Sequence, residues 1–516
     1  MGVLQYCLLG SALYAVLSNG QQCAPAIQID KKPQVFIMSD ISNEPDDTMS
    51  FIRLLVHADQ YNITGMVATT STWLNSSVVP EQILNTTHAY GKVVDNLNRH
   101  SAGSFPTSEY LSSIVKAGHP VYGTAAIGKS PLSSGATRLI DVVDGLGDEE
   151  ILFTQAWGGV NVLAETLAHI RATRAQIEID RFVKKLRVYT ISDQDNAGLW
   201  IRANFPTIPY VVSLHGFNQY QLATWSGISG DTFYGGDGGG PDPSLVSQEY
   251  VSKHFQIGPL GSHYPDIAYI MEGDSPALMH TMQNGLNGGP FDFPEWGGWG
   301  GRYILLDPSR QTMVYSDTTD TVVGKDNNTY KSNHATIWRW RQAFQDEMSA
   351  RIQWTVQSNY SAGSHPPVVS VNGSCGSAPF IVDVDPEQEI VLDGSATYDP
   401  DSNITGRNPL QFKWYQYRDV SSAQSSVSSV PQLNFTLSDD GRVATTKLPS
   451  AELACAPVEA AQNAGLGVQE TCQQYHVILE VIGSGEPPIR HYKRTILKVR
   501  PPTGESAGAK SKRDEL

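Results

Sequence analysis

Hydrophobic runs alternate with helical periodicities along residues 33–345. Short apolar, β-branched runs predict strands at Gln34–Met38, Ile63–Thr70, Ile151–Gln155, Leu186–Ile191, Pro209–Leu214 and Ala268–Met271. Amphipathic patterns between them predict helices over Pro80–Asn98, which opens with proline, and over Val160–Ala172. Short apolar strands separated by helices are typical of a mainly parallel sheet with both faces covered. We therefore predict an open, doubly wound α/β domain over residues 33–345.

The pattern changes after residue 345. Residues 346–367, which include the segment SAGSHPP, have the composition of a linker. Short alternating strands with turn signals follow at Phe380–Val384, Glu389–Leu392, Leu410–Tyr417, Tyr475–Val481 and Tyr492–Val499. This pattern predicts a smaller all-β sandwich over residues 368–500. Residues 501–516 are polar, and we expect them to form a flexible tail.

Several features of the sequence indicate the secretory pathway. Residues 1–20 are apolar and resemble a signal peptide, although a buried N-terminal helix would also fit them. The terminal Arg513-Asp514-Glu515-Leu516 is a one-letter variant of the retrieval signal K-D-E-L, so we expect residence in the endoplasmic reticulum lumen, with secretion as the alternative. Eight N-x-S/T glycosylation sequons begin at Asn62, Asn75, Asn85, Asn327, Asn359, Asn372, Asn403 and Asn434.

The cysteines agree with an oxidising compartment. Removal of a signal peptide would take Cys7 away and leave four cysteines, which are compatible with two disulfide bonds. We favour the local pair Cys455–Cys472, with Cys23–Cys375 joining the N-terminus to the second domain. The other two connectivities of four cysteines stay open.

Composition narrows the possible partners. The chain has 516 residues, 40% of them hydrophobic, and a formal net charge of −16. This content is enough for packed cores, and the negative charge disfavours nucleic acids and anionic membrane surfaces as partners. Beyond the N-terminus, no stretch approaches the roughly 20 apolar residues of a membrane-spanning helix. The oligomeric state does not follow from the sequence.

Acidic and amide side chains gather where predicted strands end. They are Asp40, Asn43, Glu44, Asp46 and Asp47 after the first strand, Asp193, Asp195 and Asn196 after the fourth, and Asp274 after the last. Ligands of an open parallel sheet bind beyond these carboxyl ends, where converging acids would repel one another. A hard divalent cation with oxygen ligands, such as Ca²⁺, resolves that repulsion. The alternative for Asp46 and Asp47 is that they only open a helix.

The segment from Asp40 to Asp47 resembles the D-x-D-x-x-x-D-D signature of the Ca²⁺-dependent nucleoside hydrolases. The longer segment SDISNEPDDTMSFIRLL is closer still to a nucleoside-hydrolase-like family of bacteria and fungi described as cellulose-binding proteins. Further matching segments are TQAWGGVNVLAETL at 154–167, VYTISDQDNAGLWIRANFP at 188–206, ATWSGISGD at 223–231, GPLGSHYP at 258–265 and MEGDSPALM from 271. The resemblance covers nearly all of residues 33–345. It extends to the β-rich tail, whose segment Val391–Asp401 resembles a PKD-type immunoglobulin-like module.

This resemblance implies a role for each of the gathered residues. It gives Ca²⁺ the ligands Asp40, Asp47, Asp274 and the backbone carbonyl near Ala156. It makes Asp46 the acid that holds a sugar hydroxyl, and it places Asn43, Asp193, Asp195 and Asn196 around the sugar. An aspartate of the signature would deprotonate the water that attacks the anomeric carbon.

Three departures from the family pattern affect catalysis. Ser42 replaces the second aspartate of the signature and cannot take a proton, so Asp40, Glu44 or Asp46 would have to act as the base. Gly273 stands where relatives often place the histidine that protonates the leaving base. Trp73 replaces an asparagine after the second strand. These changes are compatible with the metal site and make ordinary nucleoside hydrolysis doubtful.

Tryptophans near the same strand ends favour a carbohydrate ligand. Flat indole faces suit sugar rings, and we place Trp73, Trp157 and Trp299 among the substrate-binding residues. The alternative is that they fill the core beneath glycine-rich loops. We therefore predict a Ca²⁺-dependent hydrolase of glycosyl bonds, N-glycosidic by resemblance. The alternatives are a non-catalytic protein that binds carbohydrate such as a cellulose-like polysaccharide, and a lumenal protein that keeps only the fold.

Overall fold

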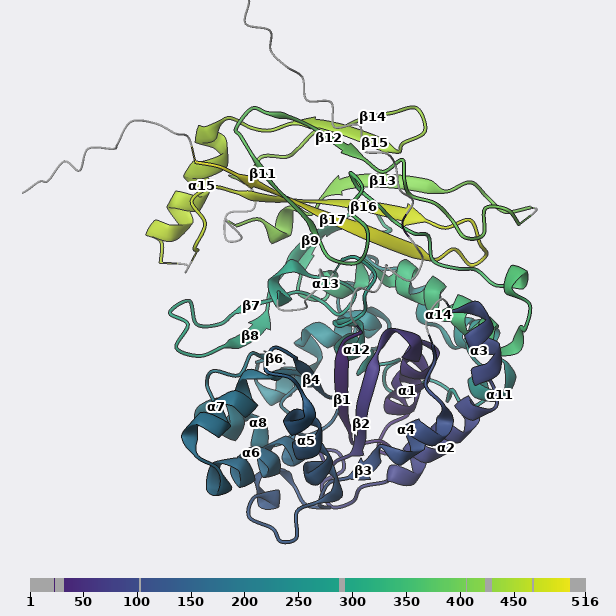
Figure 1. Cartoon of the computed structure of the whole chain (residues 1–516), viewed down its shortest axis with the longest axis vertical. Helices are drawn as coiled ribbons and strands as arrows, with labels where there is room; N and C mark the ends of the chain where they lie inside the picture. The colour runs from purple at the N-terminus through teal and green to yellow at the C-terminus, as the bar shows by residue number, and fades with distance from the viewer. Residues whose placement is uncertain are drawn as a thin grey trace, which may run out of the picture.

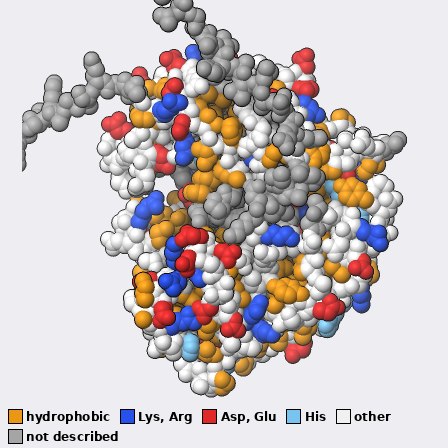
Figure 2. All heavy atoms as spheres, in the orientation of Figure 1, with side chains coloured by type: hydrophobic (Ala, Val, Ile, Leu, Met, Phe, Trp, Pro, Cys, Tyr) orange, Lys and Arg blue, Asp and Glu red, His pale blue; other side chains and the backbone are white. Residues whose placement is uncertain are grey.

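The computed structural model describes residue 23 and residues 32–101, 104–286, 293–404, 406–422, 429–465 and 468–501. The expected signal peptide and the terminal residues Arg513–Leu516 lie outside this described part. In Figure 1, a sheet with helices around it occupies the lower part of the molecule, and a β-rich part lies above it. On the face drawn in Figure 2, lysine and arginine side chains are dispersed among acidic and neutral ones.

The α/β part is built on a sheet of eight strands in the order β3-β2-β1-β4-β5-β6-β8-β7. The strands are β1 (Gln34–Ser39), β2 (Asn62–Ala68), β3 (Val115–Ala117), β4 (Leu152–Ala156), β5 (Leu186–Ser192), β6 (Tyr210–Ser213), β7 (Tyr303–Leu305) and β8 (Val314–Asp317). Neighbouring strands pair in parallel, except that β7 is antiparallel to β8. The prediction of an open, mainly parallel sheet is confirmed.

Both faces of the sheet are covered, because successive side chains of a strand point to opposite faces. Val35 and Ile37 of β1 belong to one hydrophobic core, and Phe36 and Met38 belong to the other. The first core is closed by α1 (Asp46–Val56), α2 (Pro80–Gly91), α3 (Val94–His100) and α14 (Arg341–Val356). The second is closed by α5 (Ser134–Gly145), α6 (Asn161–Thr173), α7 (Gln176–Lys184) and α8 (Ala197–Asn204), on the other side of β1 in Figure 1. The fold is doubly wound.

Shorter helices lie in the connections. They are α4 (Ser108–Ser113), α9 (Gly230–Phe233), α10 (Gln248–His254), α11 (Gly258–Gly261), α12 (Ser275–Met279) and α13 (Ala335–Trp338). The expected helix over residues 160–172 is confirmed by α6, whereas the one expected over residues 80–98 is divided into α2 and α3.

The strand predicted at Ala268–Met271 is wrong. Residues 268–270 form a tight turn in which the backbone N–H of Ile270 donates to the carbonyl oxygen of Ala268 at 2.8 Å. Tyr269 in its centre has a φ of 66°, which an extended strand does not contain. The place beside β6 is taken by β8. Ile270 and Met271 are buried without pairing in the sheet, whereas Ala268 and Tyr269 are exposed.

The β-rich part forms two sheets around its own core. One has the order β11-β17-β16-β13 and the other β12-β15-β14. Their strands are β11 (Phe380–Val384), β12 (Glu389–Asp393), β13 (Gln411–Gln416), β14 (Thr436–Leu437), β15 (Val443–Lys447), β16 (Gln474–Ile482) and β17 (Arg490–Val499). Side chains of both sheets share one hydrophobic cluster. The predicted sandwich also contains a helix that we did not expect, α15 (Ala451–Asn463).

The two parts are packed against each other. Residues 346–356, expected to begin a linker, form the larger, C-terminal part of α14. Tyr417 and Tyr492 of the β-rich part belong to the first core of the α/β part. The Tyr417 hydroxyl donates to Asp320 at 2.6 Å, and Asp320 also pairs with Arg302 at 2.7 Å. An additional two-stranded sheet, β9 (Asp320–Val323) and β10 (Thr329–Ser332), begins at this contact.

Covalent and surface features agree with an oxidising compartment. The favoured disulfides Cys23–Cys375 and Cys455–Cys472 are both present, which confirms the predicted connectivity. The asparagines of all eight sequons are exposed, so each is accessible to glycosylation. Within the described residues, we find no helix with the length and apolar character needed to cross a membrane.

Candidate functional site

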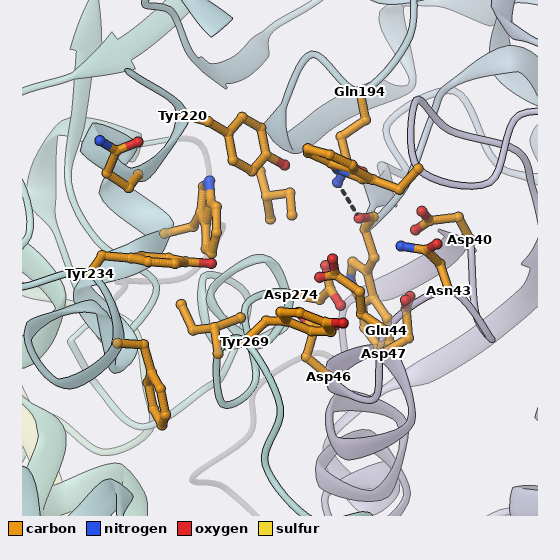
Figure 3. Close-up of a pocket in the computed structure, with 17 residues that line it drawn as sticks. Asp40, Asn43, Glu44, Asp46, Asp47, Gln194, Tyr220, Tyr234, Tyr269 and Asp274 are labelled. Carbon is orange, nitrogen blue, oxygen red and sulfur yellow. Dashed lines mark hydrogen bonds between the residues drawn. The ribbon is translucent and has the colours of Figure 1, made fainter. Parts of the chain in front are cut away.

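The candidate site lies where the strand order of the sheet reverses. From β1, the chain runs to β2 and β3 on one side and to β4, β5 and β6 on the other. Such a reversal leaves a crevice beyond the carboxyl ends of the two central strands, where ligands bind. A cavity of about 500 Å³ lies there. Its walls include Trp73 after β2, Trp157 after β4 and Gln194 after β5, together with the acidic segment after β1 (Figure 3).

Three carboxylates converge in this cavity. Asp46 and Asp47 form the first turn of α1, and Asp274 immediately precedes α12. Each offers an oxygen within 4.8 Å of an oxygen of the other two, and all three residues are buried. Asp46 and Asp47 open a helix, where carboxylates favour the positive end of the helix dipole, and they also meet an acid from a distant segment.

The carboxylates of Asp46, Asp47 and Asp274, which we call the carboxylate cluster, repel one another when they are ionised. Burial, followed by the charges of Glu44 and Asp40, raises the pKa of Asp46 to about 7. Burial and neighbouring carboxylates also raise the pKa values of Asp47 and Asp274 well above the ordinary range. The Oδ2 atom of Asp274 is buried and has no hydrogen-bond partner. An unsatisfied buried oxygen among mutually repelling acids fits a metal cation that takes oxygen ligands.

Within the cluster, the hydroxyl of Ser39 donates to Asp47 Oδ1 at 2.5 Å, which fixes that carboxylate at the end of β1. Two further acids, Asp40 and Glu44, lie beside the cluster. Asp40 accepts a hydrogen bond from the Ser71 hydroxyl, and burial raises its pKa to about 6 despite this bond. Burial also raises the pKa of Glu44. Asp40 lines the cavity next to the three-carboxylate group without belonging to it.

Ala156 and Ser42 do not line the cavity in the part of the chain that the structure describes. Ala156 ends β4 between β1 and β5, where it is paired with Met38 and Thr190 and completely buried. Ser42 is exposed and has a positive φ of 89°. The residue that replaces the second acid of the signature is therefore placed on the surface, and its side chain adds nothing to the cavity wall.

Gly273 is required by the packing of the cluster. A Cβ atom at this position would lie 2.7 Å from Asp46 Oδ2 and 3.0 Å from Cζ3 of Trp225. Neither atom belongs to the far end of a long flexible side chain. The indole of Trp225 thus occupies the space that a histidine at position 273 would need.

The expected sugar-binding residues divide into two groups. Asn43, Trp73 and Trp157 line the cavity. Trp73 is 44% exposed at its rim, whereas Trp157 is 1% exposed in its wall. Trp299 is completely buried, and its Nε1 donates to the hydroxyl of Tyr492 at 3.4 Å, so it belongs to the contact between the two parts.

Asp193, Asp195 and Asn196 lie outside the described cavity lining and join neighbouring segments. Asp193 accepts two hydrogen bonds from Arg202, at 2.8 and 2.6 Å. Asp195 accepts hydrogen bonds from the backbone N–H groups of Val160 and Ala197, at 2.9 and 2.8 Å. Asn196 accepts one from the backbone N–H group of Thr124, at 2.8 Å. Gln194, which lies between Asp193 and Asp195 in the sequence, faces the cavity instead. It lines the wall and donates from Nε2 to the carbonyl oxygen of Trp157 at 2.7 Å.

Three tyrosines also line the cavity. Tyr220, Tyr234 and Tyr269 come from the connections after β6 and before α12 (Figure 3). Tyr220 packs edge-on against Trp73, with ring centres 5.8 Å apart. We did not single out these residues from the sequence. Their only signal was their place near segments that match the family, and the irregular path of the connections decides where they point.

Comparison with known proteins agrees with this geometry. Residues 34–303 match the family model described as cellulose-binding Sde182, nucleoside hydrolase-like domain. The chain belongs to this family. Residues 389–499 match the C-terminal domain of cellulose-binding protein Sde0182, so the resemblance expected for both parts of the chain is confirmed.

A solved structure shows the same organisation as this Sde182-family chain. It is that of a nucleoside hydrolase-related hypothetical protein from Saccharophagus degradans, described as associated with carbohydrate metabolism. The two are 28% identical, with a TM-score of 0.71, and the alignment covers 91% of this chain and 100% of the other. The search of curated proteins produced no match.

Proposed function

We propose that this chain binds carbohydrate in the acidic cavity, with a divalent cation, Ca²⁺ by preference, held by Asp46, Asp47 and Asp274. The observation that carries the proposal is the convergence of three buried carboxylates, one of which, that of Asp274, has an oxygen without a hydrogen-bond partner. The bound cation would supply positive charge and open coordination positions for sugar hydroxyls. Asn43 and Gln194 offer amide groups that bind hydroxyls as donors or acceptors.

The composition of the walls supports a sugar as the ligand. Trp73, Tyr220 and Tyr234 present aromatic surface beside the acids, and such surface packs well against the C–H faces of sugar rings. The Sde182 family is described as cellulose-binding, and the solved relative as associated with carbohydrate metabolism. The first description favours a glucan or one of its fragments as the partner of this cavity, and the second favours a carbohydrate in general.

Titration calorimetry tests the proposal. Protein freed of metal by a chelator is titrated first with Ca²⁺ and then with cello-oligosaccharides. We expect saturable binding of Ca²⁺, binding of sugar only after Ca²⁺, and loss of both in Asp47→Asn. The control Asp193→Asn removes a carboxylate paired with Arg202 outside the cavity and should retain both. Unchanged titrations of Asp47→Asn would refute the assignment of the site.

Hydrolysis of a glycosyl bond is the second candidate, N-glycosidic by resemblance to the nucleoside hydrolases. One observation favours it. The Asp40 carboxyl lies in the cavity with a pKa of about 6, which suits a group that takes a proton from water near neutral pH. Glu44 and Asp46 also line the cavity, and their carboxyl groups are the other candidates for this general base. An enzyme would release sugar or base from glycosides, and Asp40→Asn would bind Ca²⁺ without turnover. If no sugar or base were released from a broad panel of glycosides and nucleosides, carbohydrate binding would remain as the only proposed function.

The secretory pathway is the proposed setting. Two disulfides and eight exposed sequons support it. A fall in mass after enzymatic removal of N-glycans from the protein isolated from its source would establish passage through the lumen. Retention in the endoplasmic reticulum is a finer proposal that depends on Arg513–Leu516, and imaging of a variant without these residues tests it.

A further inference from the structure

One of the cavity's tyrosines is carried by a strained turn. The hydrogen bond from the N–H of Ile270 to the carbonyl of Ala268, at 2.8 Å, closes a three-residue turn around Tyr269. With a φ of 66° at the central residue, this is the rare form of the γ-turn. A Cβ atom disfavours this backbone conformation, which glycine adopts freely.

The neighbours of Tyr269 hold the turn in place. Ile270 is 1% exposed, and the next residue, Met271, exchanges backbone hydrogen bonds with the hydroxyl of Ser229 at 3.2 and 3.0 Å. On the other side, the N–H of Ile267 donates to the side chain of Gln248 at 2.8 Å. Strain of this kind persists only where the surrounding structure imposes it, and it is often found at ligand sites.

Packing of the Tyr269 side chain does not offset the strain. The residue is 70% exposed, so its ring gains little from burial. The ring lines the cavity, and in Figure 3 it points inward on the side of Asp46, with Tyr220 on the opposite side of the cavity. A glycine would satisfy the turn without strain and would lack only the ring and the hydroxyl. Both of these lie where a ligand would contact them.

We propose that Tyr269 is a sugar-binding residue that, together with Tyr220 across the cavity, selects a gluco-configured ring. A pyranose whose hydroxyls are all equatorial has two C–H faces, and each can pack against an aromatic side chain. The hydroxyl of Tyr269 bonds a sugar hydroxyl at the edge of the ring. An axial hydroxyl would meet aromatic surface without a partner. This inference rests on the proposed carbohydrate-binding function and names its ligand class.

Glycine and phenylalanine substitutions separate a binding role from a structural one. Tyr269→Gly removes ring and strain together, so we expect an unchanged or higher melting temperature, unchanged Ca²⁺ affinity, and cellobiose affinity lower by about tenfold or more. Tyr269→Phe keeps the ring and should lose a smaller factor. In the wild type, galactosides and mannosides should bind more weakly than glucosides.

The matched control is Glu387→Gly in the β-rich part. Glu387 is also exposed and has a φ of 60°, so its replacement relieves the same type of strain far from the cavity. It should leave cellobiose affinity unchanged. Full cellobiose affinity in Tyr269→Gly, while wild-type binding still requires Ca²⁺, would overturn the role of Tyr269 alone. A lower melting temperature with weaker Ca²⁺ binding would show a structural role and overturn it too. If the wild type bound no sugar with Ca²⁺ present, the proposed function would fail together with this inference.

Discussion

Neutralisation of Asp46 should stabilise the metal-free protein and weaken its binding of Ca²⁺. Burial, with the charges of Glu44 and Asp40, raises the pKa of the Asp46 carboxyl from 3.8 to about 7. Since the folded state holds this proton more tightly than the unfolded chain, stability is lost as the pH rises from 3.8 towards about 7. Above that range, the ionised carboxylate opposes folding unless a cation is bound. Asparagine has the same shape without the charge.

The size of the effect follows from the two pKa values. A difference of about 3 units, at about 1.4 kcal/mol per unit, gives a cost of about 4 kcal/mol at pH 7.5. The entropy of unfolding of a chain of 516 residues is on the order of 1 kcal/mol per degree. Asp46→Asn should therefore raise the melting temperature of the metal-free protein by about 4 °C. At pH 5 the same calculation gives less than half of this increase.

Differential scanning fluorimetry in chelator measures the expected stabilisation of the metal-free protein, and the same measurement in excess Ca²⁺ shows how much of the stabilisation by Ca²⁺ is lost. Ca²⁺ at 100 times its dissociation constant should stabilise the wild type by about 2.7 kcal/mol and the variant by less. The control Asp193→Asn breaks the pair with Arg202 and should lower the melting temperature equally in both buffers. If Asp46→Asn melted below the wild type in chelator at pH 7.5, the carboxylates would not repel one another as we infer.

Three further changes have expected outcomes. Burial lowers the pKa of His100, whose Nδ1 lies 3.1 Å from Nε2 of His365. Because the unfolded chain takes up the proton at a higher pH than the folded protein, the melting temperature should fall as the pH drops below about 6.5. This fall should be smaller in His100→Gln. Replacing Cys455 and Cys472 by serine opens a short loop and should cost about 3 kcal/mol of the free energy of unfolding, measured by denaturant titration against the wild type. Gly273→Ala places a Cβ 2.7 Å from a carboxylate oxygen of the cluster and should reduce Ca²⁺ affinity in calorimetry, whereas unchanged affinity would contradict the tight packing described there.

Local patterns were enough to predict the architecture. In β1, the four apolar residues Val35–Met38 face the two cores in alternation, and a short apolar run of this kind, followed by turn residues, is typical of a strand buried on both faces. The same reasoning identified β2, β4, β5 and β6, and the favoured cysteine pairs are both present. It missed β3, β7 and β8, which have only three or four residues each and so carry little pattern of their own. It failed at Ala268–Met271, because a short apolar run does not by itself show whether a segment is extended or pairs with a neighbouring strand.

The sequence by itself determined that acids follow the strands of a doubly wound sheet, since strand, turn and helix are encoded by neighbouring residues. Only the tertiary structure decided which acids meet. Asp274 joins Asp46 and Asp47, whereas Asp193 and Asp195 bind an arginine and backbone N–H groups instead. The tyrosines of the cavity were equally hidden. Convergence depends on how long connections pack over the ends of the strands, and the contacts that direct them join residues far apart in the chain.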